Sequence, residues 1–302
     1  MPMKQIKLAV LGGDKRQLSV AKELLIQGYM TEIWGIDRTM CSSYGLVSCE
    51  NWGQVIDGCS VLILPLPASA DGLRVNCPLL SEGSSVKVSK ILDLIPTDTL
   101  VLGGKISPML KNILTEKGFH FVDYSLREEL QIKNAVPTAE GAIALAMNEL
   151  SITIAEAKAA VVGYGRIGKI LSSKLKALGA DITVLARKTT DIALAETSGF
   201  HTIRLEISPQ FNSLKELTTG YDVIFNTVPS WLFDENIVKT MNKSTLVIDL
   251  ASAPGGIDIR AAKENGIKVI WALSLPGKCA PKTAGKIVAQ TIIQILKEEG
   301  II

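Results

Sequence analysis

The sequence predicts an α/β fold of two doubly wound parallel-sheet (Rossmann-like) domains, joined by a hinge with two crossover helices. The chain has 302 residues, about twice the ~150 residues typical of one domain. Short apolar runs alternate with amphipathic stretches, a pattern typical of β-α-β units around a parallel sheet. A strand followed by a glycine turn also recurs after 151 residues, since residues 7–12 align with residues 158–163.

Composition and charge exclude several classes of protein. The sequence is 47% apolar and 21% charged, with a net charge of +2. This is an ordinary globular profile, without the basic patch expected of a nucleic-acid binder. Its apolar runs are too short for a membrane span, and residues 6–12 are too short for a signal-peptide core. Five cysteines without C-x-x-C spacing predict neither a disulfide framework nor a metal site and fit a reducing cytoplasm.

The first domain is expected to cover residues 1–134. Its strands are predicted at residues 6–11, 31–36, 61–64, 99–102 and 120–122. The second domain, residues 135–282, begins with a helix at Pro137, because proline suits the first turn of a helix and favours an extended Val136. The final helix begins at residue 283 and carries an apolar face. We therefore expect residues 283–302 to pack back onto the first domain.

The second half of the sequence predicts a complete nucleotide-binding domain. Six strands with helical crossovers are expected, at residues 159–162, 181–186, 201–205, 222–228, 245–250 and 268–272. A G-x-G-x-x-G turn follows the first of them, formed by Gly163, Tyr164, Gly165, Arg166, Ile167 and Gly168. In such turns the glycines permit a tight bend, let backbone N–H groups reach a pyrophosphate and let helix and strand pack closely. A glycine-rich turn without a ligand is the alternative.

The end of the next strand favours NADP over NAD. An NAD site usually has an acidic residue there, bonded to the ribose 2′-hydroxyl. This chain instead has Ala186, Arg187 and Lys188, followed by two threonines. Two cations suit a 2′-phosphate, and no carboxylate opposes them in this run. Both could alternatively be solvated side chains at a strand end.

Three later loops are expected to line the nicotinamide side of the same site, because ligands bind at the carboxyl ends of strands in open α/β sheets. The candidate contacts in these loops are Thr227, Val228, Pro229, Ala251, Ser252 and Pro276. No histidine follows His201 in the sequence. A His–carboxylate proton relay is therefore not expected.

The first domain repeats the opening of the second but differs where a dinucleotide would bind. Asp14 takes the place of Gly165, and Gln17 takes the place of Gly168. Because a carboxylate repels pyrophosphate, we expect this domain to have lost dinucleotide binding and to hold the substrate. The candidate substrate ligands are Arg16, Ser69, Lys105 and Thr138, and the candidate catalytic groups are Glu140 and Lys105. Each of them could instead be an ordinary solvated or capping residue.

Together these runs resemble one family, the A subunit of dipicolinate synthase from spore-forming bacteria. The matching runs cover nearly the full length in order: Gly12-Gly13-Asp14 with Arg16-Gln17, Pro137-Thr138 with Glu140-Gly141, the G-x-G-R-x-G turn, Asp249-Leu250-Ala251-Ser252 with Pro254-Gly255-Gly256, and Leu275-Pro276-Gly277 with Ala280-Pro281-Lys282-Thr283-Ala284-Gly285. Tyr164 departs from the small aliphatic residue expected at its position.

The resemblance implies an NADP-dependent dehydrogenase that oxidises dihydrodipicolinate to dipicolinate during sporulation, in the cytoplasm of the mother cell. It also implies a small dicarboxylate substrate and a second, flavoprotein-like B subunit that acts as partner, and it leaves a homo-oligomer open. A second class of function stands beside it. In that class the chain is a non-catalytic NADP-binding subunit that regulates or stabilises a partner, which the lack of a suitable histidine favours.

Overall fold

The computed structural model describes residues 6–80, 85–206 and 212–302. The chain forms two compact units: Met1–Asn134 together with Ala280–Ile302, and Ala135–Cys279. We call them the first and the second domain. The chain passes between them within the long helix α6 (Glu128–Glu149) and again after Cys279. The sequence assigns residues 1–5 to the first domain, and these lie outside the described residues.

The first domain is built on a parallel sheet whose described strands run in the order β2-β1-β3-β4-β5. These strands are β1 (Lys7–Leu11), β2 (Met30–Trp34), β3 (Val61–Ile63), β4 (Leu100–Gly103) and β5 (Phe121–Asp123). The central strands are continuous apolar runs because helices bury both of their faces. The strand order reverses between β1 and β3. That pair is therefore the switch point, where open α/β sheets bind their ligands.

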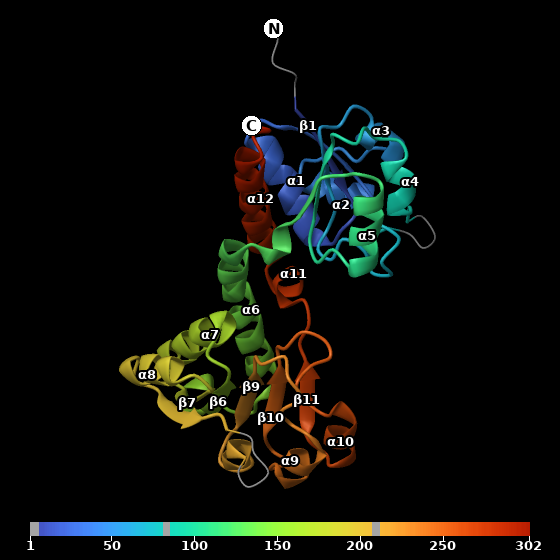
Figure 1. The fold of residues 1–302 in the computed structure, drawn as a ribbon. Helices are drawn as coiled ribbons and strands as arrows, with labels where there is room; N and C mark the ends of the chain where they lie inside the picture. The colour runs from blue at the N-terminus through green and yellow to red at the C-terminus, as the bar shows by residue number, and fades with distance from the viewer. Residues whose placement is uncertain (1–5, 81–84, 207–211) are drawn as a thin grey trace. The chain divides into compact units, whose positions relative to one another are not determined.

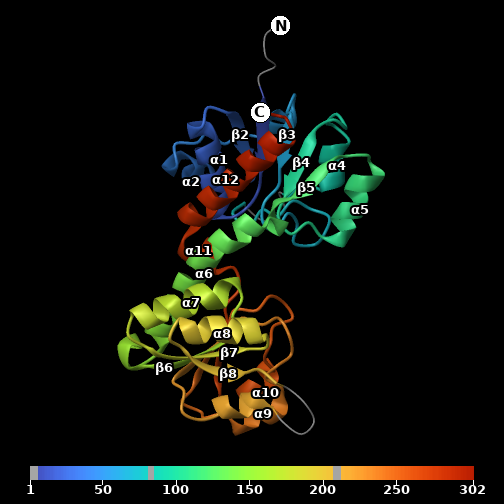
Figure 2. The same cartoon turned by 60° about the vertical axis from the view of Figure 1, so that its left-hand side comes forward.

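Helices cover both faces of this sheet (Figure 1). One core cluster joins the sheet to α1 (Lys15–Ile26), α2 (Arg38–Ser43) and α12 (Pro281–Glu298), and the opposite cluster joins it to α3 (Trp52–Ile56), α4 (Val88–Leu92) and α5 (Pro108–Glu116). The C-terminal helix α12 lies beside α1 in both views (Figures 1 and 2). Gly285 permits this approach, because a Cβ there would collide with the backbone of Arg16 and with Ser19. The last segment of the chain therefore completes the first core.

The second domain has a parallel sheet in the order β11-β10-β9-β6-β7-β8 among its described strands. They are β6 (Lys158–Val162), β7 (Asp181–Ala186), β8 (His201–Arg204), β9 (Val223–Asn226), β10 (Leu246–Asp249) and β11 (Lys268–Trp271). One face is covered by α6, α7 (Arg166–Ala177) and α8 (Thr189–Thr197), and the other by η3 (Ser213–Leu217), α9 (Glu235–Thr240) and α10 (Ile259–Glu264). This is the strand order of dinucleotide-binding domains, with its switch point between β6 and β9. The predicted fold class is confirmed.

Two local predictions are wrong. The helix expected to begin at Pro137 begins at Glu128, and Val136 is helical rather than extended. Pro137 removes one backbone donor inside α6, but the residue is buried, as are Ala135 and Ala139 on the same helix, and this burial outweighs the local preference. Residues 275–279, expected as a loop, form the short helix α11 (Leu275–Cys279), whose first turn accommodates a proline.

Candidate functional site

The turn after β6 is shaped by its three glycines. Gly163 has a φ of +98°, and a Cβ there would collide with Thr227 and Val228. A Cβ on Gly168 would collide with the carbonyl oxygen of Gly163, so glycine is needed for α7 to pack this close. Gly165 differs from both, because no atom lies within 4 Å of the place that its Cβ would take. The turn is therefore tight at its two ends and open in its middle.

The helix that follows this turn has no carboxylate or hydroxyl at its cap. Gly165 is the N-cap of α7, a helix of 12 residues, and it has no side chain to accept from the first backbone N–H groups. Those N–H groups and the positive end of the helix dipole face the open middle of the turn. An oxyanion such as a pyrophosphate satisfies both.

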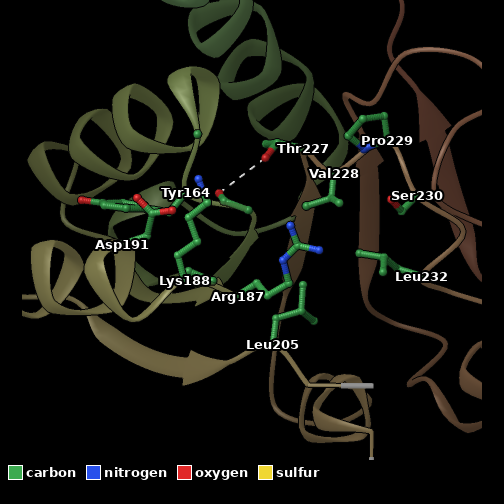
Figure 3. A pocket seen from close by; sticks show the side chains of 13 residues that line it. Tyr164, Arg187, Lys188, Asp191, Leu205, Thr227, Val228, Pro229, Ser230 and Leu232 are labelled. Carbon is green, nitrogen blue, oxygen red and sulfur yellow. Dashed lines mark hydrogen bonds between the residues drawn. The ribbon is translucent and has the colours of Figure 1, made fainter. Parts of the chain in front are cut away.

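A cavity of about 500 Å³ adjoins the turn, at the carboxyl ends of the strands (Figure 3). Nine predicted cofactor contacts line it: Gly163, Tyr164, Gly165, Ala186, Arg187, Lys188, Thr227, Val228 and Pro229. Four further residues line it without having been predicted: Asp191, Leu205, Ser230 and Leu232. The other predicted contacts are not among the lining residues: Arg166, Ile167, Gly168, Ala251, Ser252 and Pro276. The volume is that of a small-molecule pocket.

Thr227 joins the two strand ends at the switch point of the second domain. Its hydroxyl lies 2.9 Å from the carbonyl oxygen of Val162. It also lies 3.4 Å from the carbonyl oxygen of Gly163 (Figure 3). The hydroxyl therefore holds the loop after β9 against the glycine turn. Val228 and Pro229 follow it directly and form part of the cavity wall.

Arg187 and Lys188 reach toward this cavity from the end of β7 (Figure 3). Both side chains are exposed, and neither forms an ion pair in the part of the chain that the structure describes. The run from residue 186 to residue 190 holds no carboxylate, but one follows it directly. Asp191, on the first turn of α8, lines the same cavity and lies beside Tyr164 (Figure 3). Its carboxylate lies 3.6 Å from the ammonium group of Lys169, which offsets part of its charge.

Tyr164 stands where a small aliphatic residue is expected, and its side chain packs against neighbouring residues. Its ring is 6% exposed and meets Phe200 edge to face, with 6.2 Å between the ring centroids. The ammonium group of Lys169 lies 5.6 Å from the centroid of the same ring. The aromatic side chain therefore supports the outer side of the turn, and the backbone of the turn stays accessible to the cavity.

A buried polar pair holds the two loops beyond this pocket, and the sequence analysis assigned it no role. Asn226 ends β9 and Asp249 ends β10, and the amide of Asn226 donates to the Asp249 carboxylate at 2.8 Å. Asp249 also accepts from the backbone N–H groups of Ala251 and Gly256, at 3.0 and 2.9 Å. The Asn226 side chain in turn bonds both backbone groups of Val228. The sequence signal that could have pointed to this pair is the polar residue at the end of each of the two apolar strands.

At the switch point of the first domain, the turn is satisfied by its own side chains. Asp14 is the N-cap of α1, and its carboxylate accepts from the backbone N–H of Arg16 at 2.9 Å. The Arg16 guanidinium also donates to this carboxylate, from Nε (3.0 and 3.1 Å) and from Nη2 (2.9 Å). Nη2 donates further to the carbonyl of Leu66, in the loop after β3, at 2.6 Å. The predicted substrate cation is thus 9% exposed and already neutralised by a carboxylate.

Lys105, the other predicted cation of this domain, has a different environment. Its φ is +48°, and its backbone N–H is held by Asp123 and the hydroxyl of Ser125, at 3.0 and 2.9 Å. Its ammonium group is exposed and makes no ion pair within the described residues. Ser69 is buried and donates to Asp71 at 3.0 Å.

The remaining predicted catalytic and substrate residues belong to the second domain. Thr138 is partly buried on α6. Glu140 is exposed on the same helix and accepts from the ammonium group of Lys174 at 2.8 Å. The candidate substrate residues are therefore divided between the two domains, with Arg16, Ser69 and Lys105 in the first.

Both histidines lie at the amino ends of strands. His120 directly precedes β5 and lies 2.8 Å from Glu299, whereas His201 begins β8 and lies 3.7 Å from Asp181. The cavity adjoins the opposite, carboxyl edge of its sheet. Neither histidine of the chain therefore lines this pocket.

Other chemistry was sought across the described residues. No cluster of histidine, cysteine, aspartate and glutamate in them is placed to hold a metal ion. None of the described helices has the length and apolar content needed to cross a bilayer. The cysteines are free thiols, and burial raises the pKa of Cys59 and of Cys77 to about 11. These two thiols are therefore protonated and unreactive near neutral pH.

Two family models match the chain. Residues 7–125 match the N-terminal domain of the dipicolinate synthase A subunit, and residues 147–301 match the alanine dehydrogenase/PNT C-terminal domain. The second match places a dehydrogenase-type domain where the glycine turn and its cavity lie. It supports an oxidoreductase that uses a nicotinamide cofactor.

Similar proteins match over nearly the full chain. The dipicolinate synthase A subunit of Bacillus subtilis (strain 168) is 34% identical over 299 residues, which covers 97% of this chain and 96% of that protein. The crystal structure of the A subunit of dipicolinate synthase from Bacillus halodurans has a TM-score of 0.87 at 28% identity, covering 97% of this chain and 98% of that one. The crystal structure of its counterpart from Bacillus subtilis has a TM-score of 0.83 at 32% identity, covering 98% and 97%. The chain therefore belongs to the family of dipicolinate synthase A subunits.

Proposed function

We propose that this protein oxidises dihydrodipicolinate to dipicolinate, with NADP as the hydride acceptor. The reaction removes a hydride and a proton from the ring, and NADP⁺ becomes NADPH. The names of the similar proteins supply the product. The observation that carries the cofactor assignment is the pair of unpaired cations, Arg187 and Lys188, at the rim of the cavity beside the glycine turn.

The residues around the cavity fit a dinucleotide. The open space in front of Gly165 and the uncapped start of α7 leave room and N–H donors for a pyrophosphate. The side chains of Val228, Leu205 and Leu232 offer an apolar surface for a flat base. Arg187 supplies a planar guanidinium that can bind a 2′-phosphate with two parallel hydrogen bonds. Asp191 can accept from a ribose hydroxyl, with Lys169 limiting its repulsion of the phosphate.

The chemical step makes modest demands on the protein. Bound NADP⁺ supplies the hydride acceptor, and loss of hydride leaves an aromatic ring, so the step is intrinsically favourable. The chain must hold the substrate in position, exclude water and accept one proton. Glu140 is the proposed proton acceptor. Its carboxylate is exposed and bonded to Lys174, a cation that would hold it in place.

The proposed substrate ligands are Arg16, Ser69 and Lys105 of the first domain, and Thr138 of α6. The two carboxylates of the substrate need uncompensated positive charge. Lys105 meets this need, because no carboxylate pairs with its ammonium group within the described residues. Arg16 is already neutralised by Asp14, so it would contribute directed N–H donors rather than net charge. Ser69, in the loop after β3, is the third proposed ligand of this domain.

The setting of the activity is part of the same proposal. The similar proteins are named for the A component of a synthase, so we propose a second, flavoprotein-like B subunit that acts as partner. The cell of action would be the mother cell of a sporulating bacterium, and the compartment its cytoplasm. The alternative of a non-catalytic NADP-binding subunit keeps one observation in its favour, since neither histidine is among the residues that line the cavity.

Reduction of NADP⁺ by the isolated full-length chain, followed at 340 nm with freshly prepared dihydrodipicolinate, separates these functions. We expect absorbance to rise with one NADPH formed for each dipicolinate. Lys105→Gln should raise KM about tenfold or more, by loss of a charged hydrogen bond, with the affinity for NADP unchanged. Glu140→Gln should lower kcat more than it alters KM. NADP binding without any turnover would favour the non-catalytic role.

A further inference from the structure

A second cavity, of about 260 Å³, lies in the first domain on the outer side of α1 and α12. Its lining residues come from α1, from α12 and from the end of α2: Ser19, Lys22, Glu23, Ile26, Ser43, Tyr44, Lys282 and Lys286. None of them is a residue proposed above to hold cofactor or substrate. This cavity is called the lysine pocket below.

The lysine pocket carries uncompensated positive charge. Lys22, Lys282 and Lys286 are exposed, and within the described residues none of them pairs with a carboxylate. Glu23 is the one acidic lining residue, so the lining has three cations and one anion. The Lys282 ammonium group lies 5.9 Å from the centroid of the Tyr44 ring, which draws it over the aromatic face. A ligand with two negative charges would neutralise the pocket.

Ser19 is a second, independent observation in favour of a ligand at this pocket. The residue is 8% exposed, lines the pocket, and its hydroxyl has no hydrogen-bond partner in the described structure. A buried hydroxyl without a partner costs about 1–3 kcal/mol. Ser19 also packs against Gly285, so its position is set by the crossing of α1 and α12. An oxyanion in the pocket would accept from this hydroxyl and from the lysines together.

The start of α12 adds to the positive electrostatic potential at the lysine pocket. Its N-cap is Ala280, which provides no side-chain acceptor, and Lys282 and Lys286 stand on its first two turns. The helix has 18 residues, so its amino end carries the partial positive charge of a full dipole. Donors therefore outnumber acceptors around the lysine pocket.

We propose that the lysine pocket is a binding site for a small dianion, such as a phosphate group or a compact dicarboxylate. Lysine ammonium groups are flexible point charges, unlike the planar guanidinium of arginine. The site therefore selects a ligand by its charge and size rather than by the arrangement of its oxygen atoms. Its volume suits a compact ligand and is too small for a dinucleotide. The proposal is independent of the cofactor and substrate assignments above.

Calorimetric titration of the cofactor-free, full-length protein at low ionic strength tests the proposal. The probes are inorganic phosphate, pyridine-2,6-dicarboxylate and acetate. We expect at least one of the dianions to bind with a stoichiometry of one at this site, and acetate to bind at least tenfold more weakly. Binding of phosphate alone would identify a phosphate site, and binding of the dicarboxylate alone a carboxylate site. If neither dianion binds, the proposal is wrong.

Variants assign any binding to this pocket rather than to the cofactor turn. The double variant Lys282→Gln/Lys286→Gln should weaken dianion binding at least tenfold, and Ser19→Ala should weaken it several-fold without lowering stability. Glu23→Gln should strengthen binding, an effect that loss of fold cannot mimic. Lys297→Gln, on the last turn of the same helix, is the matched control and should change nothing. Binding that disappears with Arg187→Ala but survives the double variant would overturn the proposal.

Discussion

After β6 the first turn of the helix is left without an acceptor, whereas after β1 the equivalent position carries a carboxylate. Gly12 and Gly163 both have positive φ, at 61° and 98°, so the bend itself is shared. The difference lies at the cap, where Asp14 binds the backbone and guanidinium of Arg16, and Gly165 has no side chain to accept a hydrogen bond. At the start of this helix, the first domain carries the Asp14 carboxylate. The second domain leaves the same position open for an anionic ligand.

The third glycine position extends this contrast. Gly168 lets α7 approach the carbonyl of Gly163, and its counterpart Gln17 fills the same place in the first domain. Gln17 is 3% exposed, and a Cβ on Gly13 would collide with its side chain. A first domain without Asp14 would therefore still lack the space of a dinucleotide turn. The two domains thus share one turn topology but form different sites. The residues at two positions, Asp14 or Gly165 and Gln17 or Gly168, determine whether the turn has space for a dinucleotide.

The largest effect is expected from copying the carboxylate into the second domain. Gly165→Asp should weaken NADP binding more than about 100-fold, because like charges brought together in a binding site cost several kcal/mol. The chain should stay folded, since no atom obstructs a Cβ there and aspartate is a favourable N-cap. Calorimetric titration and thermal unfolding measure the two quantities. Gly165→Ala controls for the added Cβ and should lose less affinity.

The reverse substitution should damage stability without creating a site. Asp14→Gly leaves the buried Arg16 guanidinium with only the carbonyl of Leu66 among its present partners. We expect a loss of about 3 kcal/mol in the free energy of unfolding, typical of breaking a buried ion pair, measured by urea denaturation. The NADP stoichiometry should not rise. Asp14→Asn, which keeps the cap acceptor, should cost less.

Arg187→Ala tests which cofactor the open turn is built for. A hydrogen bond to a charged group contributes on the order of 1–3 kcal/mol, so NADP affinity should fall by that amount while NAD affinity stays nearly constant. Titrations of both cofactors against the variant give the answer. Equal losses for the two cofactors would remove the 2′-phosphate assignment. Lys215→Gln, in the same domain but outside the cavity lining, is the charge control.

The smallest effect concerns the way the first domain is closed by the C-terminal helix. Arg127 hydrogen-bonds Glu298 on α12 at 2.7 Å and lowers the pKa of that carboxyl from 4.5 to about 2, with help from Gln294. A lowered pKa in the folded state stabilises the fold above pH 4.5, and this contribution is lost as the pH falls from 4.5 toward 2.

The wild type should therefore be slightly more stable than Arg127→Gln near neutral pH, and the two should converge as the pH approaches 2. Urea denaturation at several pH values follows the difference. Glu129, whose pKa Arg127 also lowers, acts in the same direction. NADP titration of the second domain should not distinguish the two proteins. A difference that grew toward low pH would contradict this account of the pair.

The strands were predictable because their signal is local. Each run that predicts a strand is found as one, with its ends displaced by at most two residues. The central strands are unbroken apolar stretches because both of their faces are buried. The glycine turn was predictable for the same reason, because its conformation depends on three residues in a row. Pro137 shows the limit, since packing of its neighbours in α6 outweighed the local rule.

The parts of the site that escaped prediction depend on contacts between distant residues. The bond from Asn226 to Asp249 joins residues on two strands, and a polar residue at the end of each apolar run does not by itself show that the two meet. Asp191 reaches the cavity only because α8 begins immediately after Lys188 and turns it inward. The pairing of Asp14 with Arg16 was within reach of the sequence, since they are two residues apart. The sequence prediction instead gave the two residues separate roles: Asp14 as a charge that repels pyrophosphate, and Arg16 as a substrate ligand.

The central claim is that a single open turn, in the second domain, binds the cofactor. The most direct measurement is the stoichiometry of NADP binding to the wild-type chain by calorimetry, with protein and ligand concentrations determined independently. We predict one NADP per chain, with tighter binding than NAD under the same conditions. Two equivalents per chain would contradict the claim, because the first domain would then bind a dinucleotide despite Asp14 and Gln17.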